Sequence, residues 1–202
     1  NIGFKDINSH IGINVAYNLN ENLAIENVWQ NSIKIGIHEE QKIGIISVIA
    51  FKESITSIIN YYLNYNQEYK KLEGDDLIQF TRLSSKEIAD FLIKAWIIVS
   101  QKWDKCFNEI DHQYDFDSEF KSFRYNSNYY IQKTIGVKSI NYLLGDIIKQ
   151  KYDSTFSVKS LNDFEQAIFN SKLIDKDWLL GKTLSGYSSE SGFGKVSQII
   201  RN

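Results

Sequence analysis

An apolar stripe between residues 85 and 110 constrains the fold more than any other feature of the sequence. Apolar side chains recur there at every third or fourth position, in the order Ile88, Leu92, Ala95, Val99, Trp103 and Cys106. This spacing places them on one face of an α-helix. The preceding tetrapeptide SSKE, residues 84–87, has the form of a capping box. The sequence therefore predicts a long helix over residues 85–110 that buries one face in a core.

Weaker apolar periodicity predicts further helices along the chain. Residues 2–9 fit the last turns of a helix, and a short helix is expected at the C-terminal end. Other helices are expected over 14–30, over 48–64 after Ser47, over 130–150, and over 161–173 after Ser160. Residues 66–80 are expected to form a polar loop. Alternating isoleucines on both sides of HEEQK favour a β-hairpin near residues 32–46. The expected fold is mainly α with a small β-hairpin, in the α+β class, with one helical domain over 14–202.

Composition places the chain among ordinary globular proteins. It has 202 residues, of which 43% are hydrophobic and 24% are charged, and no apolar run has the length of a membrane span. Its single cysteine, Cys106, excludes an internal disulfide and favours the reducing cytoplasm of a bacterium. The formal net charge of -2 argues against a protein that coats DNA with its whole surface, although a local basic patch stays open.

The start of the sequence, NIGFKDINSHIGI, has the pattern of the interior of an element. Phe4, Ile7 and Ile11 already follow helical spacing, and the chain contains no methionine. We therefore expect an internal segment of a longer protein. The alternative is that modified methionines were dropped from the written sequence.

Three short stretches together carry a resemblance to a known family. They are FKDINSH at residues 4–10, IQKTIGVKSINYLLGDII at residues 131–148, and GYSSESGFGKVSQIIR at residues 186–201. Their order resembles that of the DGQHR-domain family, which includes the DndB regulators of DNA phosphorothioation gene clusters. Within the second stretch, the family pattern falls on Lys133, Thr134, Gly136, Leu143 and Leu144, with Ile135 inserted. The motif D-G-Q-H-R itself is absent, so none of its residues can be placed here.

The resemblance implies that residues 1–13 are the tail end of a DGQHR/ParB-like domain that is mostly absent, and that the helical part follows this domain. It implies a bacterial regulatory protein of DNA modification or anti-phage defence that binds DNA, controls transcription and contacts other DNA-modification proteins, with no membrane partner. One alternative is the helical scaffold of a ParB-like nucleotide hydrolase or nuclease whose catalytic residues lie elsewhere. Another is a protein–protein interaction module. No cofactor is expected in this segment, whereas a nucleotide stays open as a ligand of the longer protein.

The C-terminal GYSSESGFGK stretch is the first candidate for a phosphate or DNA backbone. Gly192 and Gly194 are expected just before a helix, with Lys195 in its first turn. Free N–H groups at a helix start attract anions, and glycines let a phosphate approach the backbone. Lys182 and Arg201 are candidate helpers. The alternative is a flexible connector, because the stretch does not complete a P-loop.

Two further groups of residues have both a functional and a structural interpretation. Arg124 beside YNSNYY, residues 125–130, is the one aromatic and basic cluster expected to be exposed, and it would suit base stacking. Core packing is the alternative for its aromatics. Asn8 and Ser9 are expected to face a pocket formed with the missing domain, as the resemblance implies, or to cap the end of a helix.

The remaining polar clusters do not predict a catalytic site or a metal site. The acidic stretch EIDHQYDFDSE, residues 109–119, could hold a divalent metal, but its spacing matches no known metal motif and favours a solvated loop. No metal site is predicted. His10 and His38, both expected in loops or turns, have no nucleophile partner in a recognisable motif. Cys106 on the apolar stripe is expected to be a buried, unreactive thiol.

Overall fold

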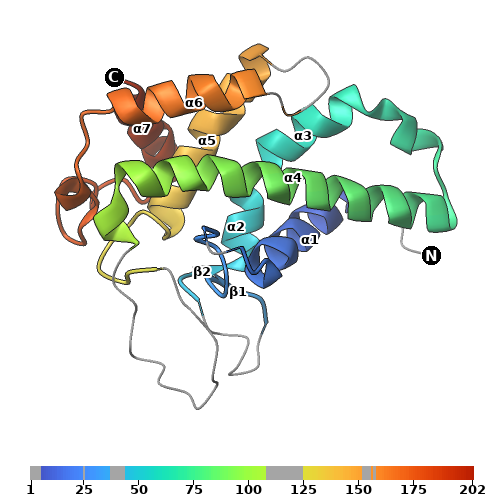
Figure 1. Ribbon diagram of the computed structural model, residues 1–202, viewed down its shortest axis with the longest axis horizontal. Coiled ribbons are helices and arrows are strands. Elements are labelled where there is room, and N and C mark those ends of the chain that lie inside the picture. The colour runs from blue at the N-terminus through green and yellow to red at the C-terminus, as the bar shows by residue number, and fades with distance from the viewer. Residues whose placement is uncertain (1–5, 25, 37–43, 108–124, 152–155, 157) are drawn as a thin grey trace.

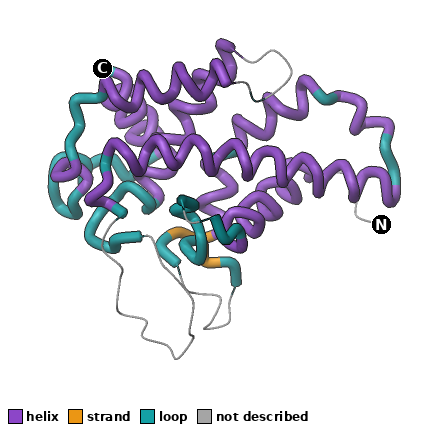
Figure 2. The backbone as a smooth tube through the Cα atoms, in the orientation of Figure 1, coloured by secondary structure: helices purple, strands orange, loops and turns teal. Residues whose placement is uncertain are grey.

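The structure is a computed structural model that describes residues 6–24, 26–36, 44–107, 125–151, 156 and 158–202. The main helices are α1 (Ile7–Glu21), α2 (Val48–Ser54), α3 (Thr56–Tyr65), α4 (Gly74–Lys102), α5 (Thr134–Lys151), α6 (Val158–Asn170) and α7 (Glu190–Arg201). Short 3-10 turns are η3 (Gln67–Lys71), η4 (Asp104–Cys106) and η6 (Asp175–Trp178). The strands are β1 (Ile33–Lys34) and β2 (Ile46–Ser47). The predicted class, mainly α with a small β element, is confirmed (Figure 2).

Two helices organise the molecule. α4 runs across most of the width of the molecule in Figure 1 and packs against α1 and α6. α5 packs against α2, α3, α6 and α7. Trp96 on α4 and Asn141 on α5 join the two helices through a hydrogen bond of 3.1 Å from the indole nitrogen to the amide oxygen. One hydrophobic core therefore connects the N-terminal and C-terminal helices.

The apolar stripe of α4 is confirmed, but its boundaries were predicted wrongly. All six stripe residues are fully buried, but only the first four lie in α4, which ends at Lys102 and not at residue 110 as predicted. The helix begins at Gly74, inside the expected polar loop, with Asp75 and Asp76 in its first turn, where negative charge complements the helix dipole. Ser84 is therefore no N-cap. The neighbouring Ser85 donates its hydroxyl to the carbonyl of Thr81 at 2.6 Å, a bond available only inside a helix.

The two strands pair in parallel, so the predicted hairpin is wrong. Ile33 pairs with Ile46, and Lys34 pairs with Ser47. Alternating apolar residues indicate a strand but not its direction, because side chains alternate in both kinds of ladder. The HEEQK turn lies outside the described residues. Gly44 adopts a left-handed φ of 132°, and a Cβ atom there would lie 2.7 Å from the carbonyl oxygen of Ser32.

The first described helix begins where the sequence predicted a helix end. Asp6 caps α1, since its side chain accepts a hydrogen bond of 3.0 Å from the backbone N–H of Ser9. Asn8 and Ser9 thus lie in the first turn of α1. The expected domain boundary between residues 13 and 14 falls within this same helix, which packs against α2, α3 and α4.

The capping predictions had mixed outcomes. Ser47 caps α2 as predicted and accepts the N–H of Ala50 at 3.2 Å. The expected helix over 48–64 is interrupted at Ile55, where the Ser54 hydroxyl bonds the carbonyl of Phe51 at 2.6 Å. Ser160 is buried inside α6, which begins at Val158, so it is no N-cap. The N-cap of α7 is Ser189.

Aromatic side chains fill the core. The four tryptophans are fully buried and form two edge-to-face pairs. The ring centroids of Trp29 and Trp96 are 4.6 Å apart, and those of Trp103 and Trp178 are 5.2 Å apart. Cys106 is buried as expected, and burial followed by the nearby Asp175 and Asp104 raises the pKa of its thiol. Within the described residues, no helix combines the length and apolarity needed to cross a membrane.

Candidate functional site

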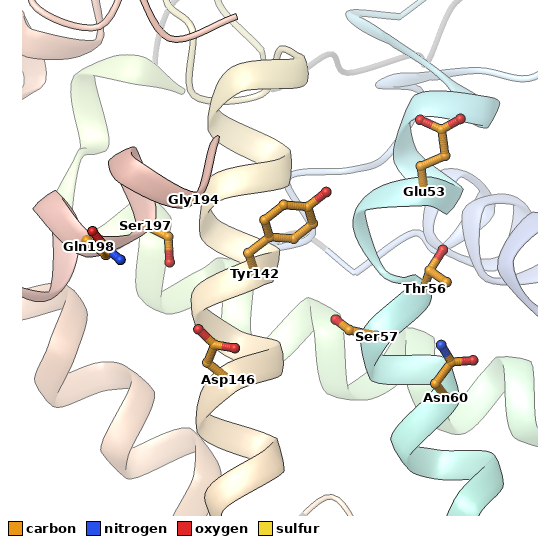
Figure 3. Close-up of a pocket in the computed structure, with 9 residues that line it drawn as sticks. All are labelled: Glu53, Thr56, Ser57, Asn60, Tyr142, Asp146, Gly194, Ser197 and Gln198. Atoms are coloured by element: carbon orange, nitrogen blue, oxygen red, sulfur yellow. The ribbon is translucent and has the colours of Figure 1, made fainter. Parts of the chain in front are cut away.

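A polar groove lies over α5, between α2–α3 on one side and α7 on the other. It encloses about 480 Å³. Its lining residues are Glu53, Thr56, Ser57, Asn60, Tyr142, Asp146, Gly194, Ser197 and Gln198. Figure 3 shows Tyr142 and Asp146 on α5 between the residues from the two walls. Every lining residue except Gly194 thus carries a hydroxyl, amide or carboxylate group.

The direction of the helices sets the shape of the groove. α5 and α7 run in the same direction, because Lys138 pairs with Glu190 near their starts and Asp146 shares the groove with Gln198 two turns later. On the other side, α3 approaches α5 closely at Gly145, where a Cβ atom would lie 2.6 Å from the Ser57 hydroxyl oxygen. The floor is therefore one face of α5, where residues four apart align.

One end of the groove is closed by an ionic cluster around Lys138. The ammonium of Lys138 forms ion pairs with Glu53 on α2, at 3.1 Å, and with Glu190 on α7. The Tyr142 hydroxyl donates to the other oxygen of Glu190 at 2.8 Å, and the ring of Phe193 lies 5.2 Å from the ammonium. Lys138 is only 5% exposed. A single buried cation therefore links α2, α5 and α7.

The cluster shifts the acidity of its members. Burial and then the hydrogen bond to Glu190 raise the pKa of Tyr142 to about 12. Burial alone would lower the pKa of Lys138, but its hydrogen bonds to Glu190 and Glu53 outweigh burial and raise it. The hydrogen bonds from Lys138 and Tyr142 lower the pKa of Glu190. At neutral pH the cluster accordingly holds a charged Lys138, a charged Glu190 and a neutral Tyr142.

We expect Glu190→Gln to reduce stability more at neutral than at acid pH. Because the pKa of Glu190 is lowered on folding, its contribution is full above the ordinary glutamate value of about 4.3 and is lost as the pH falls through the lowered value. The Glu190 side chain is 65% exposed, so the loss should stay within the roughly 1 kcal/mol of surface ion pairs. Urea unfolding near neutral pH and near about pH 3 measures the difference. An equal loss at both pH values would contradict this prediction.

Of the C-terminal phosphate candidates, the structure places only some at the groove. Gly192 and Gly194 lie inside α7 and not before it as predicted. Gly194 lines the groove, with open space where a Cβ would stand. Gly192 packs on Tyr187, whose carbonyl oxygen would lie 2.8 Å from an added Cβ, so this glycine is needed for close packing. Its N–H is already bonded to Ser189.

The candidate cations of this region are exposed but not gathered on one face. Lys182, Lys195 and Arg201 are all exposed. Arg201 lies three helical turns after Glu190, hence on the groove side of α7. Lys195 follows Gly194 and so points about 100° away around the helix. Lys182 lies in the segment between η6 and α7.

The N-terminal candidates lie beside the groove through their hydrogen-bond partners. The Asn8 amide donates to the amide oxygen of Asn60, a lining residue, at 2.6 Å. The Ser9 hydroxyl accepts a hydrogen bond of 2.9 Å from the ammonium of Lys52. Both side chains therefore join α1 to the helices of one groove wall.

The remaining candidates do not contribute to the groove. Arg124, His38 and the acidic stretch 109–119 lie outside the described residues. Tyr125 is only 2% exposed, so it is not the surface stacking platform that the sequence suggested. His10 lies in α1 and not in a loop. The part of the chain that the structure describes holds no group of three or more histidine, cysteine or carboxylate side chains suited to a metal ion.

Sequence reasoning missed four residues that define the groove and its closed end: Lys138, Tyr142, Asp146 and Glu190. Lys138, Tyr142 and Asp146 are four apart, so they form a polar stripe opposite the apolar face of α5. That stripe was visible in the sequence. The contacts of Lys138 and Tyr142 with Glu190 were not visible in the sequence, because α5 and α7 meet only through tertiary packing.

Comparison of the chain with protein-family models, curated proteins and solved structures gives no match. The resemblance to the DGQHR-domain family therefore stays a prediction.

Proposed function

We propose that the protein is a DNA-associated regulatory protein of a bacterial DNA-modification or defence system, of the DndB-like, DGQHR-domain type. In this proposal the helical segment supports DNA binding and contacts with other DNA-modification proteins. The chemistry of any nucleotide turnover would belong to another part of a longer protein.

The main support for the proposal is that the three stretches that resemble the DGQHR-domain family all lie around one groove. The second stretch provides the floor through Tyr142 and Asp146, and the third provides one wall through Gly194. The first reaches the opposite wall through the bond from Asn8 to Asn60. Segments that lie far apart in the sequence would need to meet in this way if they formed one functional face.

Charge indicates where DNA would contact this face. The groove lining carries the carboxylates of Glu53 and Asp146, which repel phosphate. The exposed cations Lys182, Lys195 and Arg201 lie outside that lining. The proposal therefore places the DNA backbone against these exposed cations of α7 and the segment before it, outside the groove lining.

Salt-dependent binding of a short DNA duplex tests the proposal. We expect fluorescence anisotropy to give an association constant that falls linearly with salt on logarithmic axes, because bound phosphates release counterions. Replacing Lys182, Lys195 and Arg201 together with glutamate should make the slope shallower by about 0.9 for each phosphate that the variant no longer neutralises. Lys86→Glu, at an exposed position of α4, is the matched control and should leave the slope unchanged.

Three results would count against the proposal. They are an absence of duplex binding, binding that does not respond to salt, and equal reductions of the slope in the triple variant and the control. Nucleotide turnover by the protein without duplex binding would favour the alternative of an enzyme scaffold.

A further inference from the structure

Several polar side chains in the groove have no hydrogen-bond partner among the described residues. Ser57, Asp146, Ser197 and Gln198 all line the groove and make no hydrogen bond or ion pair there. Ser197 is the most telling, because it is only 6% exposed and its hydroxyl points into the groove (Figure 3). The Ser197 hydroxyl oxygen itself reaches the groove surface and makes no hydrogen bond to the described residues, so it is available to a ligand. A bound molecule would supply the missing partner.

The charge of the lining selects the kind of molecule. The nine lining residues include two carboxylates and no lysine, arginine or histidine. Glu53 is already paired with Lys138, whereas Asp146 has no ion-pair partner among the described residues. An ionised carboxylate only accepts hydrogen bonds, so it favours a ligand that donates them and carries positive charge. A phosphate or carboxylate ligand would be repelled.

The shape of the groove suits a small and slender ligand. Its volume of about 480 Å³ lies within the range of small-molecule sites, roughly 300–1,000 Å³. Gly194 leaves the α7 wall open, since no atom lies within 4 Å of the place where its Cβ would stand. Tyr142 lies one turn before Asp146 on the floor, and an aromatic ring attracts a cation.

We propose that the groove binds a small aliphatic amine through its ammonium group. The ammonium donates hydrogen bonds to the Asp146 carboxylate and the Ser197 hydroxyl. The carbon chain lies along the floor beside Tyr142. This site is separate from the outer cationic surface proposed for DNA, so each can fail without the other.

Calorimetric titration with putrescine, a four-carbon diamine, tests the proposal on the protein without DNA. We expect saturable binding of putrescine and none of the neutral diol of the same chain length or of succinate. Asp146→Asn should weaken binding by about tenfold or more, the loss expected for a charged hydrogen bond. Gly194→Leu should abolish binding by filling the groove.

The control is Asp90→Asn, which removes the same charge from an exposed position on α4. It should leave putrescine affinity unchanged, and thermal unfolding should show each variant to be folded. The proposal is overturned if putrescine does not bind, if succinate binds equally well, or if Asp90→Asn weakens binding as much as Asp146→Asn. A failure of Gly194→Leu to reduce binding in a folded variant would also overturn it.

Discussion

Gly136→Ala is expected to destabilise the protein by about 3 kcal/mol or more, at the upper end of overpacking changes. A Cβ atom at this position would lie 2.2 Å from the carbonyl oxygen of Ile131, an atom of the backbone. No rotamer change can relieve this approach, so the start of α5 would have to move. Urea unfolding of the purified variant measures the reduction in stability.

The matched control is Gly194→Ala in α7. Its Cβ would enter open space, and replacing a helical glycine by alanine commonly adds up to about 1 kcal/mol. Both substitutions add one methyl group. Opposite changes in the free energy of unfolding would therefore show that the room around the new methyl group decides the outcome. Similar changes in both variants would contradict the close approach at Gly136. This approach also gives Gly136, a position of the family pattern, a structural reason to be glycine.

Trp96→Ala is expected to cost about 3–5 kcal/mol, the usual loss for a buried tryptophan. Trp96 is fully buried and packs against Trp29 at 4.6 Å between ring centroids. Its indole N–H also begins a polar chain through the core. Asn141 accepts that N–H, and its amide in turn donates to the Ser54 hydroxyl at 2.8 Å. The chain connects α4, α5 and α2.

A double-mutant cycle separates this hydrogen bond from packing. Trp96→Phe keeps an aromatic ring but removes the donor, leaving the Asn141 oxygen short of a partner at a cost of about 1–3 kcal/mol. Combining it with Asn141→Ala should give less than the sum of the two single losses, with a coupling energy of about 0.5–3 kcal/mol. Strictly additive losses in urea unfolding would show that the two residues do not act together.

The sequence predicts a helix correctly where the burial of one apolar face is enough to determine it. The stripe from Ile88 to Cys106 is buried as its spacing required, because a one-sided apolar face has no other stable place in water. The boundaries were not predictable in the same way. Ser84 and Ser85 form a capping pattern locally, but the helix continues through them because Asp75 and Asp76 support an earlier start.

The pairing direction of the strands and the lining of the groove could not be predicted from the sequence alone. The direction of pairing between Ile33 and Ile46 depends on the path of the intervening chain, not on alternation. Gly194 was predicted to let a phosphate approach the backbone before a helix, and it is instead a helical residue that opens a wall of the groove. The unpaired state of Asp146 and Ser197 depends on how three helices pack, which no local motif encodes.

The burial of the four tryptophans fixes what optical spectroscopy can detect in this molecule. Their indoles all lie in the interior, so intrinsic emission excited at the indole band should be blue-shifted and should report global unfolding alone. The close pairs Trp29–Trp96 and Trp103–Trp178 should give strong near-ultraviolet dichroism that vanishes when packing is lost. The groove contains only the phenol of Tyr142 as a chromophore. Occupancy of the groove should thus be nearly silent in tryptophan fluorescence and should be followed by calorimetry or by nuclear resonances of α5.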